Sequence, residues 1–277
     1  MKKGLIVLLV LLSIFLAIGC TDNGSEATNE TSTPVTAETP VSGQEPDIIT
    51  VSAAASLTEA FTDMESQFED ENPDIDVNFN FGGSGNLRMQ IEGGAPVDVF
   101  ASADETHMDT LANENLIDNS SREDFVQNSL VLIVPANSIH NITGLQDLAD
   151  PQIEKIGIGN PDTVPVGKYA RLALTEAGLL EPLEKKMVLA EDVKHVLVYV
   201  EREEVDAGFV YMTDAKTAKP GTIRIVTSVP VSTPVTYPIA VVSSSEHKEE
   251  AQEFVDFVTG EEGQEVLEKY GFTALSK

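Results

Sequence analysis

Two serines stand where strand-like runs give way to helix-like runs, and both could bind an anion. Ser56 lies in Ser-Ala-Ala-Ala-Ser-Leu-Thr-Glu (52–59), and Ser84 lies in Phe-Gly-Gly-Ser-Gly (81–85). The first N–H groups of a helix have no intrahelical acceptor, and the helix dipole places partial positive charge there. Such a terminus binds anions without a cationic side chain. Two of them close together, each with a serine hydroxyl, would form a cradle for a small oxyanion.

Each serine also has a simpler structural interpretation. Ser56 and Glu59 fit the capping box, in which a serine and a glutamate three residues later satisfy N–H groups at a helix start. Ser84 lies between glycines and could belong to a tight turn, because glycine allows close backbone approach. At this point both interpretations remain open at both serines.

The elements that must position the serines follow a regular alternation. From Asp47 onward, short β-rich runs alternate with helical ones, which indicates an α/β fold with largely parallel sheets. Strands are expected at 48–51 and 77–81, and helices at 57–69 and 86–92. In such folds the ligand binds beyond the carboxyl ends of the strands, where the helix N-termini point. Both serines occupy positions of this kind.

Two long apolar runs, 130–134 and 237–242, have no clear role in the alternation on either side of them. We interpret them as hinge strands that join two lobes across a ligand cleft. The first lobe is expected to contain residues 47–129 together with 237–277. The second lobe is expected to contain residues 130–236.

The N-terminal residues are typical of a targeting segment. Two lysines precede an apolar run (5–18) that is short for a membrane span, so residues 1–20 are expected to be a lipoprotein signal peptide with lipid attached to Cys20. An uncleaved N-terminal anchor is the alternative, because the leucine lies one place farther from Cys20 than usual. Residues 21–46, rich in Thr, Ser, Glu, Asn and Pro, are expected to form a flexible tether. The folded part is then held at the outer face of the cytoplasmic membrane.

The charge of the chain limits the possible partners. It has 46 acidic and 17 basic residues, a formal net charge of −29. This argues against nucleic-acid binding, which needs a basic surface. The acidity also repels an anionic ligand, although a salty medium would shorten the Debye length and remove most of that repulsion. Cys20 is the only cysteine, so an intrachain disulfide and a thiolate metal site are impossible.

Motifs spread over residues 47–272 resemble the molybdate-binding proteins of ABC transporters, a branch of the type II periplasmic substrate-binding proteins. The matching segments occur in the order of that family: AAASL (53–57), FGGSG (81–85), APVDVFASAD (95–104), VPVGKYA (164–170), AEDV (190–193), GFVYMTDA (208–215), YPIA (237–240) and YGF (270–272). The resemblance implies a two-lobed α/β fold with the ligand in the cleft between the lobes.

The resemblance maps the oxyanion contacts of the family onto five positions. It implies hydroxyl and N–H donors at Ser56 and Ser84, backbone N–H donors at Val166 and Val193, and a phenolic donor at Tyr211. The metal of the ligand is then contacted only through the oxygens of its oxyanion, with no direct metal ligand and no cofactor. Without the resemblance, the two valines and the tyrosine would pass as core residues.

The resemblance implies a monomeric extracytoplasmic solute-binding lipoprotein that is not an enzyme. Its ligands would be molybdate and tungstate, and its partners an ABC permease and the associated ATPase. A binding protein for another tetrahedral oxyanion such as sulfate, or an anion-sensing domain, is the alternative. Related archaeal binders add carboxylate ligands in a motif not found here, although Asp162 lies nearby in sequence. A serine hydrolase is disfavoured, because the residues around Ser84 miss the G-x-S-x-G pattern by one place.

Overall fold

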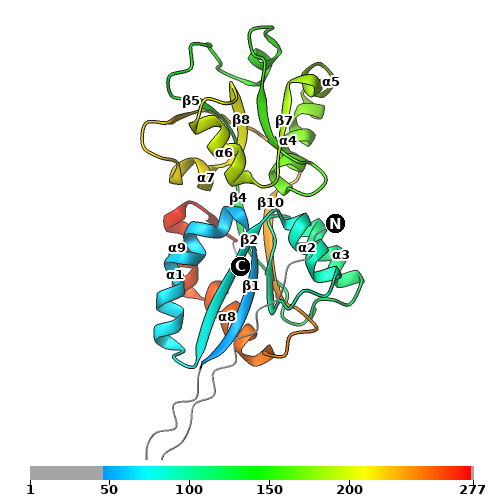
Figure 1. Cartoon of the computed structure of the whole chain (residues 1–277), viewed down its shortest axis with the longest axis vertical. Helices are drawn as coiled ribbons and strands as arrows, with labels where there is room; N and C mark the ends of the chain where they lie inside the picture. Colours follow the sequence, from blue (N-terminus) through cyan, green and yellow to red (C-terminus); the bar gives the residue numbers. More distant parts are fainter. Residues whose placement is uncertain (1–45, 276–277) are drawn as a thin grey trace, which may run out of the picture. The chain divides into compact units, whose positions relative to one another are not determined.

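The computed structural model describes residues 46–275, and in this part of the chain the strands form two sheets (Figure 1). These residues fall within one compact unit, 44–277. The signal peptide expected at 1–20, with Cys20, and all but the last residue of the tether expected at 21–46 lie outside the described residues. Within residues 46–275, every helix is too short or too polar to cross a membrane.

The first sheet has six strands in the order β11-β4-β10-β3-β1-β2. They are β1 (Asp47–Ala54), β2 (Ile75–Gly82), β3 (Val99–Ala101), β4 (Glu123–Asn128), β10 (Val235–Val241) and β11 (Thr273–Ala274). β1 pairs parallel with β2 and β3, whereas β10 pairs antiparallel with β3 and β4. We call this sheet and its helices lobe 1.

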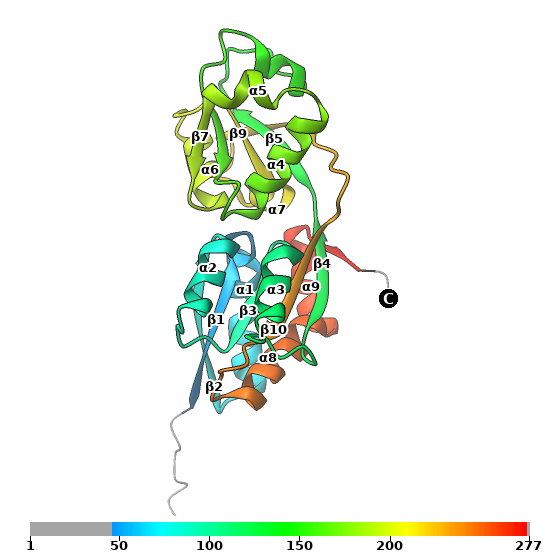
Figure 2. The ribbon, with the colours of Figure 1, turned by 90° about the vertical axis from the view of Figure 1, so that its right-hand side faces the viewer.

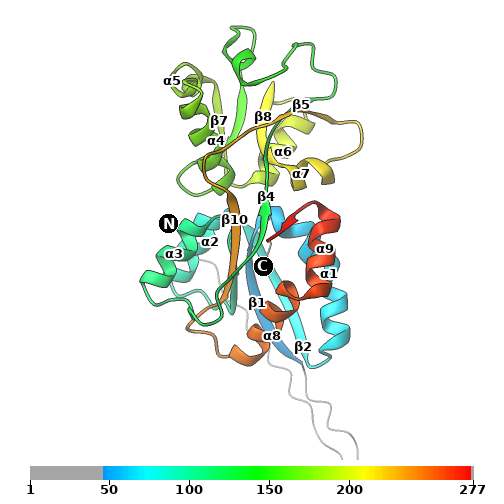
Figure 3. The ribbon, with the colours of Figure 1, turned by 180° about the vertical axis from the view of Figure 1, so that it is seen from behind.

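Helices cover both faces of the lobe 1 sheet. They are α1 (Thr58–Glu71), α2 (Ser84–Glu92), α3 (Glu105–Asn113), α8 (Lys248–Thr259) and α9 (Glu261–Tyr270). Figures 2 and 3 show α2 and α3 on one face and α1, α8 and α9 on the other. Successive strand residues point to opposite faces, so Phe100 of β3 packs with Leu87 and Met108, while its neighbour Val99 joins the larger core on the other face.

The second sheet has five strands in the order β7-β6-β8-β5-β9. They are β5 (Leu130–Pro135), β6 (Ile156–Gly159), β7 (Met187–Ala190), β8 (Ala207–Tyr211) and β9 (Ile223–Ser228). β6 pairs parallel with β7 and β8, and β5 pairs antiparallel with β8 and β9. The helices are α4 (Pro165–Glu176), α5 (Leu180–Leu183), α6 (Val193–Glu201) and α7 (Met212–Thr217). We call this sheet and its helices lobe 2.

The expected two-lobed α/β architecture is confirmed, but both sheets are mixed, so the expectation of largely parallel sheets is wrong. The run 130–134 lies within β5, and 237–241 lies within β10; the chain crosses between the lobes just before these strands, at Ser129 and over 229–234 (Figure 3). β4 leaves lobe 1 and β10 returns to it directly beside β4. Two strands joined in this way run in opposite directions, so antiparallel pairing enters the sheet at the crossing.

Candidate functional site

A small cavity lies where the two lobes meet, with about 200 Å³ of empty space that includes its opening to solvent. Its wall includes every residue that the sequence predicted as a ligand contact: Ser56, Ser84, Val166, Val193 and Tyr211. Most of the other residues in the wall are alanine, glycine, valine or proline. The structure therefore brings together five residues from segments that lie far apart in the sequence.

Lobe 1 supplies the cavity with two turns that follow neighbouring strands. After β1 the chain forms a short 3₁₀ helix (Ala55–Leu57) that contains Ser56. After β2, Gly83 precedes α2, and Ser84 is the first residue of that helix. Because β1 and β2 are parallel neighbours, their carboxyl ends, and the serines that follow them, lie at the same edge of the sheet.

The capping box expected from Ser56 and Glu59 is wrong. The Ser56 Oγ lies 2.8 Å from the Oη of Tyr237 on β10. The Glu59 carboxylate lies 2.6 Å from the Nζ of Lys194 in lobe 2. Partners from another strand and from the other lobe therefore take both side chains away from the local backbone.

Lobe 2 faces the cavity with the starts of α4 and α6. Val193 is the first residue of α6, after the N-cap Asp192, and Val166 is the second residue of α4, after Pro165. Since N–H groups in the first turn of a helix have no intrahelical acceptor, those of the two valines are available to a ligand. Both valine side chains are buried in the core. The side chains thus anchor the helices whose backbones face the cavity.

The start of α4 lies unusually close to β6. A Cβ atom on Gly167 would lie 1.9 Å from the carbonyl oxygen of Gly159, the last residue of β6. Any other residue would push the helix away from the strand. Gly167 therefore fixes where the N–H of Val166 lies relative to the cavity.

Hydroxyl groups from both lobes complete the wall. The Ser84 Oγ accepts the backbone N–H of Ala103 at 3.0 Å, which leaves the serine hydrogen available. The Tyr211 Oη is buried and has no hydrogen-bond partner among the described residues. Leaving such a group unsatisfied costs about 1–3 kcal/mol, so the fold keeps this hydroxyl at a cost that a ligand oxygen would remove. Burial raises the pKa of Tyr211 well above its usual value, so the phenol remains a donor.

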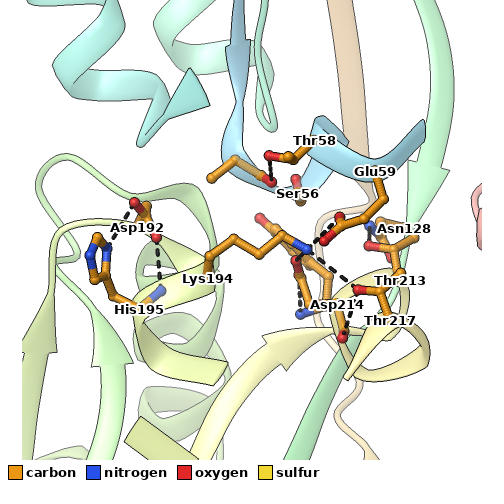
Figure 4. A network of polar contacts seen from close by, with 12 residues as sticks. Ser56, Thr58, Glu59, Asn128, Asp192, Lys194, His195, Thr213, Asp214 and Thr217 are labelled. Carbon is orange, nitrogen blue, oxygen red and sulfur yellow. Dashed lines mark hydrogen bonds and ion pairs between the residues drawn. The ribbon is translucent and has the colours of Figure 1, made fainter. Parts of the chain in front are cut away.

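Among the described residues that line the cavity, none is a lysine or arginine. One of them, Asp192, is acidic. Both of its oxygens are engaged by His195: Oδ1 accepts the backbone N–H at 2.9 Å, and Oδ2 lies 2.9 Å from Nδ1 (Figure 4). Asp162 is exposed and lies outside the cavity wall. Within residues 46–275, no group of three or more His, Cys, Asp or Glu could hold a metal ion. The wall therefore offers hydrogen-bond donors without a countering cation.

The two lobes touch directly beside the cavity. The N–H of Gly85 in lobe 1 donates to the carbonyl oxygen of Thr163 in lobe 2 at 2.8 Å. A Cβ on Gly85 would lie 2.7 Å from the Thr163 Cα, and a Cβ on Gly83 would lie 2.7 Å from the Glu191 carbonyl oxygen. The glycines of this loop thus allow backbone to approach backbone across the cleft, which encloses the cavity on this side.

Two lysines at the edge of the cleft also connect the lobes, and sequence reasoning missed both. The Nζ of Lys168 lies 2.9 Å from the Oδ2 of Asp104 in lobe 1. The Nζ of Lys194 lies 2.6 Å from Glu59 in lobe 1 and 3.1 Å from the buried Asp214 in lobe 2 (Figure 4). Burial lowers the pKa of Lys194, but the two carboxylates outweigh burial, and the net pKa is raised. We call Lys168–Asp104 and Lys194–Glu59 the rim pairs.

The sequence feature that could have revealed the rim pairs is the position of each lysine close to a predicted ligand contact. Lys168 follows Val166 by two residues, and Lys194 directly follows Val193. A long side chain at the start of a helix that faces a cleft can reach the opposite lobe. Its acidic partner, however, lies in a distant part of the sequence, and no local pattern identifies it.

Comparison with known proteins gives a consistent result. The family of bacterial extracellular solute-binding proteins matches residues 49–273. A putative ABC transporter substrate-binding lipoprotein, YvgL, of Bacillus subtilis (strain 168) is 35% identical over 99% of this chain and 99% of its own. The molybdate-binding protein ModA of Escherichia coli (strain K12) is 37% identical over 81% of this chain and 88% of its own. Among solved structures, the substrate binding domain of a putative molybdenum ABC transporter from Clostridium difficile is 37% identical to this chain, with a TM-score of 0.63. The match covers 83% of this chain and 99% of that structure.

Proposed function

Because the chain belongs to the family of bacterial extracellular solute-binding proteins, we propose that it captures molybdate between its lobes and delivers it to an ABC permease and its ATPase. Membership confirms the resemblance to the molybdate-binding proteins of ABC transporters, with the type II periplasmic binding protein fold. The family is one of solute-binding proteins. We propose that tungstate is a second ligand and that the protein binds these ligands without catalysing a reaction.

The observation that carries the proposal is the cavity, which both lobes line with donors and, within the described part of the chain, with no cation. We assign the contacts to the hydroxyls of Ser56, Ser84 and Tyr211 and to the N–H groups of Ser56, Ser84, Val166 and Val193. A dianion loses hydration when it enters such a cavity. Each charge-assisted hydrogen bond returns about 1.5–3 kcal/mol, so several fixed donors can compensate for that loss.

The same donors favour one chemical class of ligand. A site made of donors disfavours hydrogen phosphate, because the proton of that ion needs an acceptor. Sulfate has the charge and shape of molybdate, so its exclusion must come from the size of the closed cavity. Molybdate and tungstate are nearly equal in size, and we expect both to bind.

The proposal extends to the location of the protein. We propose that lipid on Cys20 holds a monomer at the outer face of the cytoplasmic membrane. The name of the Bacillus subtilis relative, a substrate-binding lipoprotein that aligns over 99% of this chain, supports this anchor. Mass spectrometry of the N-terminal peptide from membranes should detect acylated Cys20. An unmodified, uncleaved N-terminus would contradict the anchor without affecting the ligand assignment.

Calorimetric titration of the purified protein with molybdate, tungstate and sulfate tests the ligand assignment. We expect tight binding of molybdate and tungstate and weak or no binding of sulfate. Absence of heat with both metal oxyanions would overturn the proposal. Tight sulfate binding with weak molybdate binding would instead assign the cavity to another tetrahedral anion.

A further inference from the structure

A chain of hydrogen bonds runs from the crossing between the lobes to the Ser56 hydroxyl in the cavity wall. It begins at the backbone N–H of Ser129, which donates to the Oδ1 of Asn128 at 2.8 Å. The Nδ2 of Asn128 donates to the Thr213 Oγ1 at 2.9 Å and to the Tyr237 Oη at 3.2 Å. The Tyr237 Oη lies 2.8 Å from the Ser56 Oγ. Figure 4 labels Ser56 and Asn128 at the two ends of the path through Tyr237, and Thr213 as the second acceptor of the Asn128 amide.

The direction of each bond follows from the one before it. The backbone N–H of Ser129 fixes which end of the Asn128 amide carries the hydrogens, and that end can only donate to Tyr237. Burial raises the pKa of Tyr237 well above its usual value, so the phenol keeps its proton. Among its described hydrogen-bond partners, the Ser56 Oγ is the acceptor for that proton. Ser56 therefore accepts from Tyr237, and its own hydrogen is left to point into the cavity.

Ser129, where the chain begins, is exposed, but the three side chains that follow it are buried. Tyr237 is 0% exposed, Ser56 4% and Asn128 9%. In such a low-dielectric environment hydrogen bonds are stronger than in water, and a reversed dipole or an unpaired group is costly. The orientation of the Asn128 amide, which the Ser129 N–H fixes at the crossing between the lobes, therefore determines the orientation of the Ser56 hydroxyl in the cavity wall.

We propose that Asn128 and Tyr237 are positioning residues that hold Ser56 as a hydrogen-bond donor toward the ligand and thereby favour a fully deprotonated oxyanion. This inference rests on the proposed function. Ser84 has the same polarity, because its Oγ accepts the Ala103 N–H. Both serines of lobe 1 then present hydrogens, and a ligand that carries its own proton meets donors on this side.

The substitution Asn128→Asp reverses the chain at nearly constant size. The new carboxylate accepts the hydrogen of Tyr237, so the phenolic oxygen becomes free to accept from Ser56. The serine hydrogen then points away from the cavity, and its lone pairs face the anion. By calorimetry we expect the Kd for molybdate to rise about 10- to 100-fold, the range of one charge-assisted hydrogen bond. An unchanged Kd would overturn the inference.

A double variant separates the reversed polarity from the added negative charge. In Asn128→Asp/Tyr237→Phe the carboxylate remains, but no phenol takes the hydrogen of Ser56. We expect the affinity to return to within about threefold of Tyr237→Phe alone, a non-additivity that residues in one network show. If the double variant stays as weak as Asn128→Asp, charge repulsion explains the loss, and the inference fails.

Tyr237→Phe alone gives a readout that does not depend on the buried carboxylate. Without the phenol the Ser56 hydroxyl is free to rotate and accept. We expect molybdate affinity to fall less than about 10-fold, and the preference for molybdate over inorganic phosphate, measured by competition near neutral pH, to fall at least about fivefold. An unchanged preference would contradict the proposed orientation of Ser56.

Thr213→Val is the matched control, because it removes the other acceptor of the Asn128 amide and leaves the path to Ser56 intact. We expect its Kd to stay within about twofold of the unaltered protein. If Thr213→Val loses as much affinity as Asn128→Asp, the loss arises from disturbing the crossing between the lobes and not from the orientation of Ser56, and the inference is overturned.

Failure of the unaltered protein to bind molybdate would reject the proposed function. Normal binding with no effect of Asn128→Asp rejects this inference alone.

Discussion

The cavity and the rim pairs both join the two lobes, but they do so by opposite means. The described wall of the cavity presents neutral donors and holds no lysine or arginine. The rim pairs use full charges, Lys168 with Asp104 and Lys194 with Glu59, each a lysine of lobe 2 with a carboxylate of lobe 1. These two lysines, which lie in the first turns of the ligand helices, are thus paired with carboxylates of the protein and do not act as counter-charges for the anion.

The exposure of the two regions explains how they differ in energy. Ser56, Ser84 and Tyr211 are at most 4% exposed, whereas each rim pair has one exposed partner, Lys168 at 44% and Glu59 at 36%, and one more buried partner, Asp104 at 1% and Lys194 at 22%. Exposed ion pairs contribute about 0.2–1 kcal/mol, and hydrogen bonds to a charged group about 1.5–3 kcal/mol. We infer that the affinity resides in the cavity, and that the rim pairs make a small contribution to holding the lobes together.

The largest expected effect comes from preventing the lobes from meeting at the cavity. In Gly85→Ala the new Cβ would lie 2.7 Å from the Thr163 Cα, with other backbone atoms of Thr163 at similar range. Backbone cannot move aside as a side chain can, so we expect calorimetry to show about 100-fold weaker molybdate binding.

The comparison for this change lies three residues away, at the end of β2. Gly82→Ala places its Cβ 3.4 Å from the nearest atom, in the Leu87 side chain, which is ordinary contact. Because Gly82 also lines the cavity, its variant measures the effect of a methyl group in the wall, and we expect a smaller loss of molybdate affinity than for Gly85→Ala. Normal binding by Gly85→Ala would mean that the contact between Gly85 and Thr163 is not needed in the bound state, and the rim pairs would then have to carry more of the closure.

A smaller loss is expected from Tyr211→Phe, which removes one donor from the cavity wall. Because the Tyr211 hydroxyl is buried without a partner among residues 46–275, its removal should weaken molybdate binding about 10-fold while leaving the ligand-free protein as stable or more stable. Calorimetry and thermal unfolding without ligand measure the two effects. If the variant is less stable and its affinity for molybdate is unchanged, the Tyr211 hydroxyl stabilises the fold and does not bind the ligand.

Tyr169→Phe is the matched control, since that tyrosine lies outside the cavity wall and its hydroxyl donates to the Pro234 carbonyl oxygen at 3.3 Å. It should show the opposite pattern, with slightly lower stability and little change in affinity. The same pattern in both tyrosine variants would contradict the distinction between the cavity and its surroundings.

The parts of the site that could be predicted from sequence are those set by local structure. Ser84 and Val193 each begin a helix shortly after a strand, and Val166 lies in the first turn of another. The position of such a residue at the carboxyl edge of a parallel pair follows from the strand–helix alternation alone. The roles of Val166, Val193 and Tyr211 came from the family resemblance, because a valine at a helix start and a tyrosine at the end of a strand are equally consistent with core positions.

The parts that could not be predicted depend on contacts between distant segments. Lys194 and Glu59 are 135 residues apart, and Ser56 and Tyr237 are 181 apart. The same distant partners made the capping box prediction fail, since each of its two side chains had a stronger partner elsewhere. The mixed sheets were missed for a related reason: strand direction at β4 and β10 depends on where the chain leaves and re-enters lobe 1, which no local pattern records.

A still smaller effect is expected when one rim pair is broken. Glu59→Gln removes the lobe 1 carboxylate and keeps the pair between Lys194 and the buried Asp214. For a partly exposed ion pair we expect the Kd for molybdate to rise about two- to fivefold. A loss of molybdate affinity as large as that of Tyr211→Phe would mean that the rim pairs contribute as much to binding as a donor in the cavity wall. Lys194→Met is a poorer probe, because it leaves Asp214 buried and unpaired and should destabilise the whole protein.

The smallest effect is expected from ionic strength, and its direction tests the comparison most directly. The formal net charge of −29 repels a dianion at long range, and the described cavity wall holds no cation to attract it. The Debye length falls from about 30 Å at 0.01 M salt to about 3 Å at 1 M, so the association rate constant should rise a few-fold over that range. The dissociation rate should change less, because buried hydrogen bonds are poorly screened. Stopped-flow tyrosine fluorescence can measure both, since the chain has five tyrosines and no tryptophan. An association rate constant that falls with added salt would show that an unpaired positive charge guides the ligand into the cavity, and the contrast between a neutral cavity and a charged rim would then be wrong.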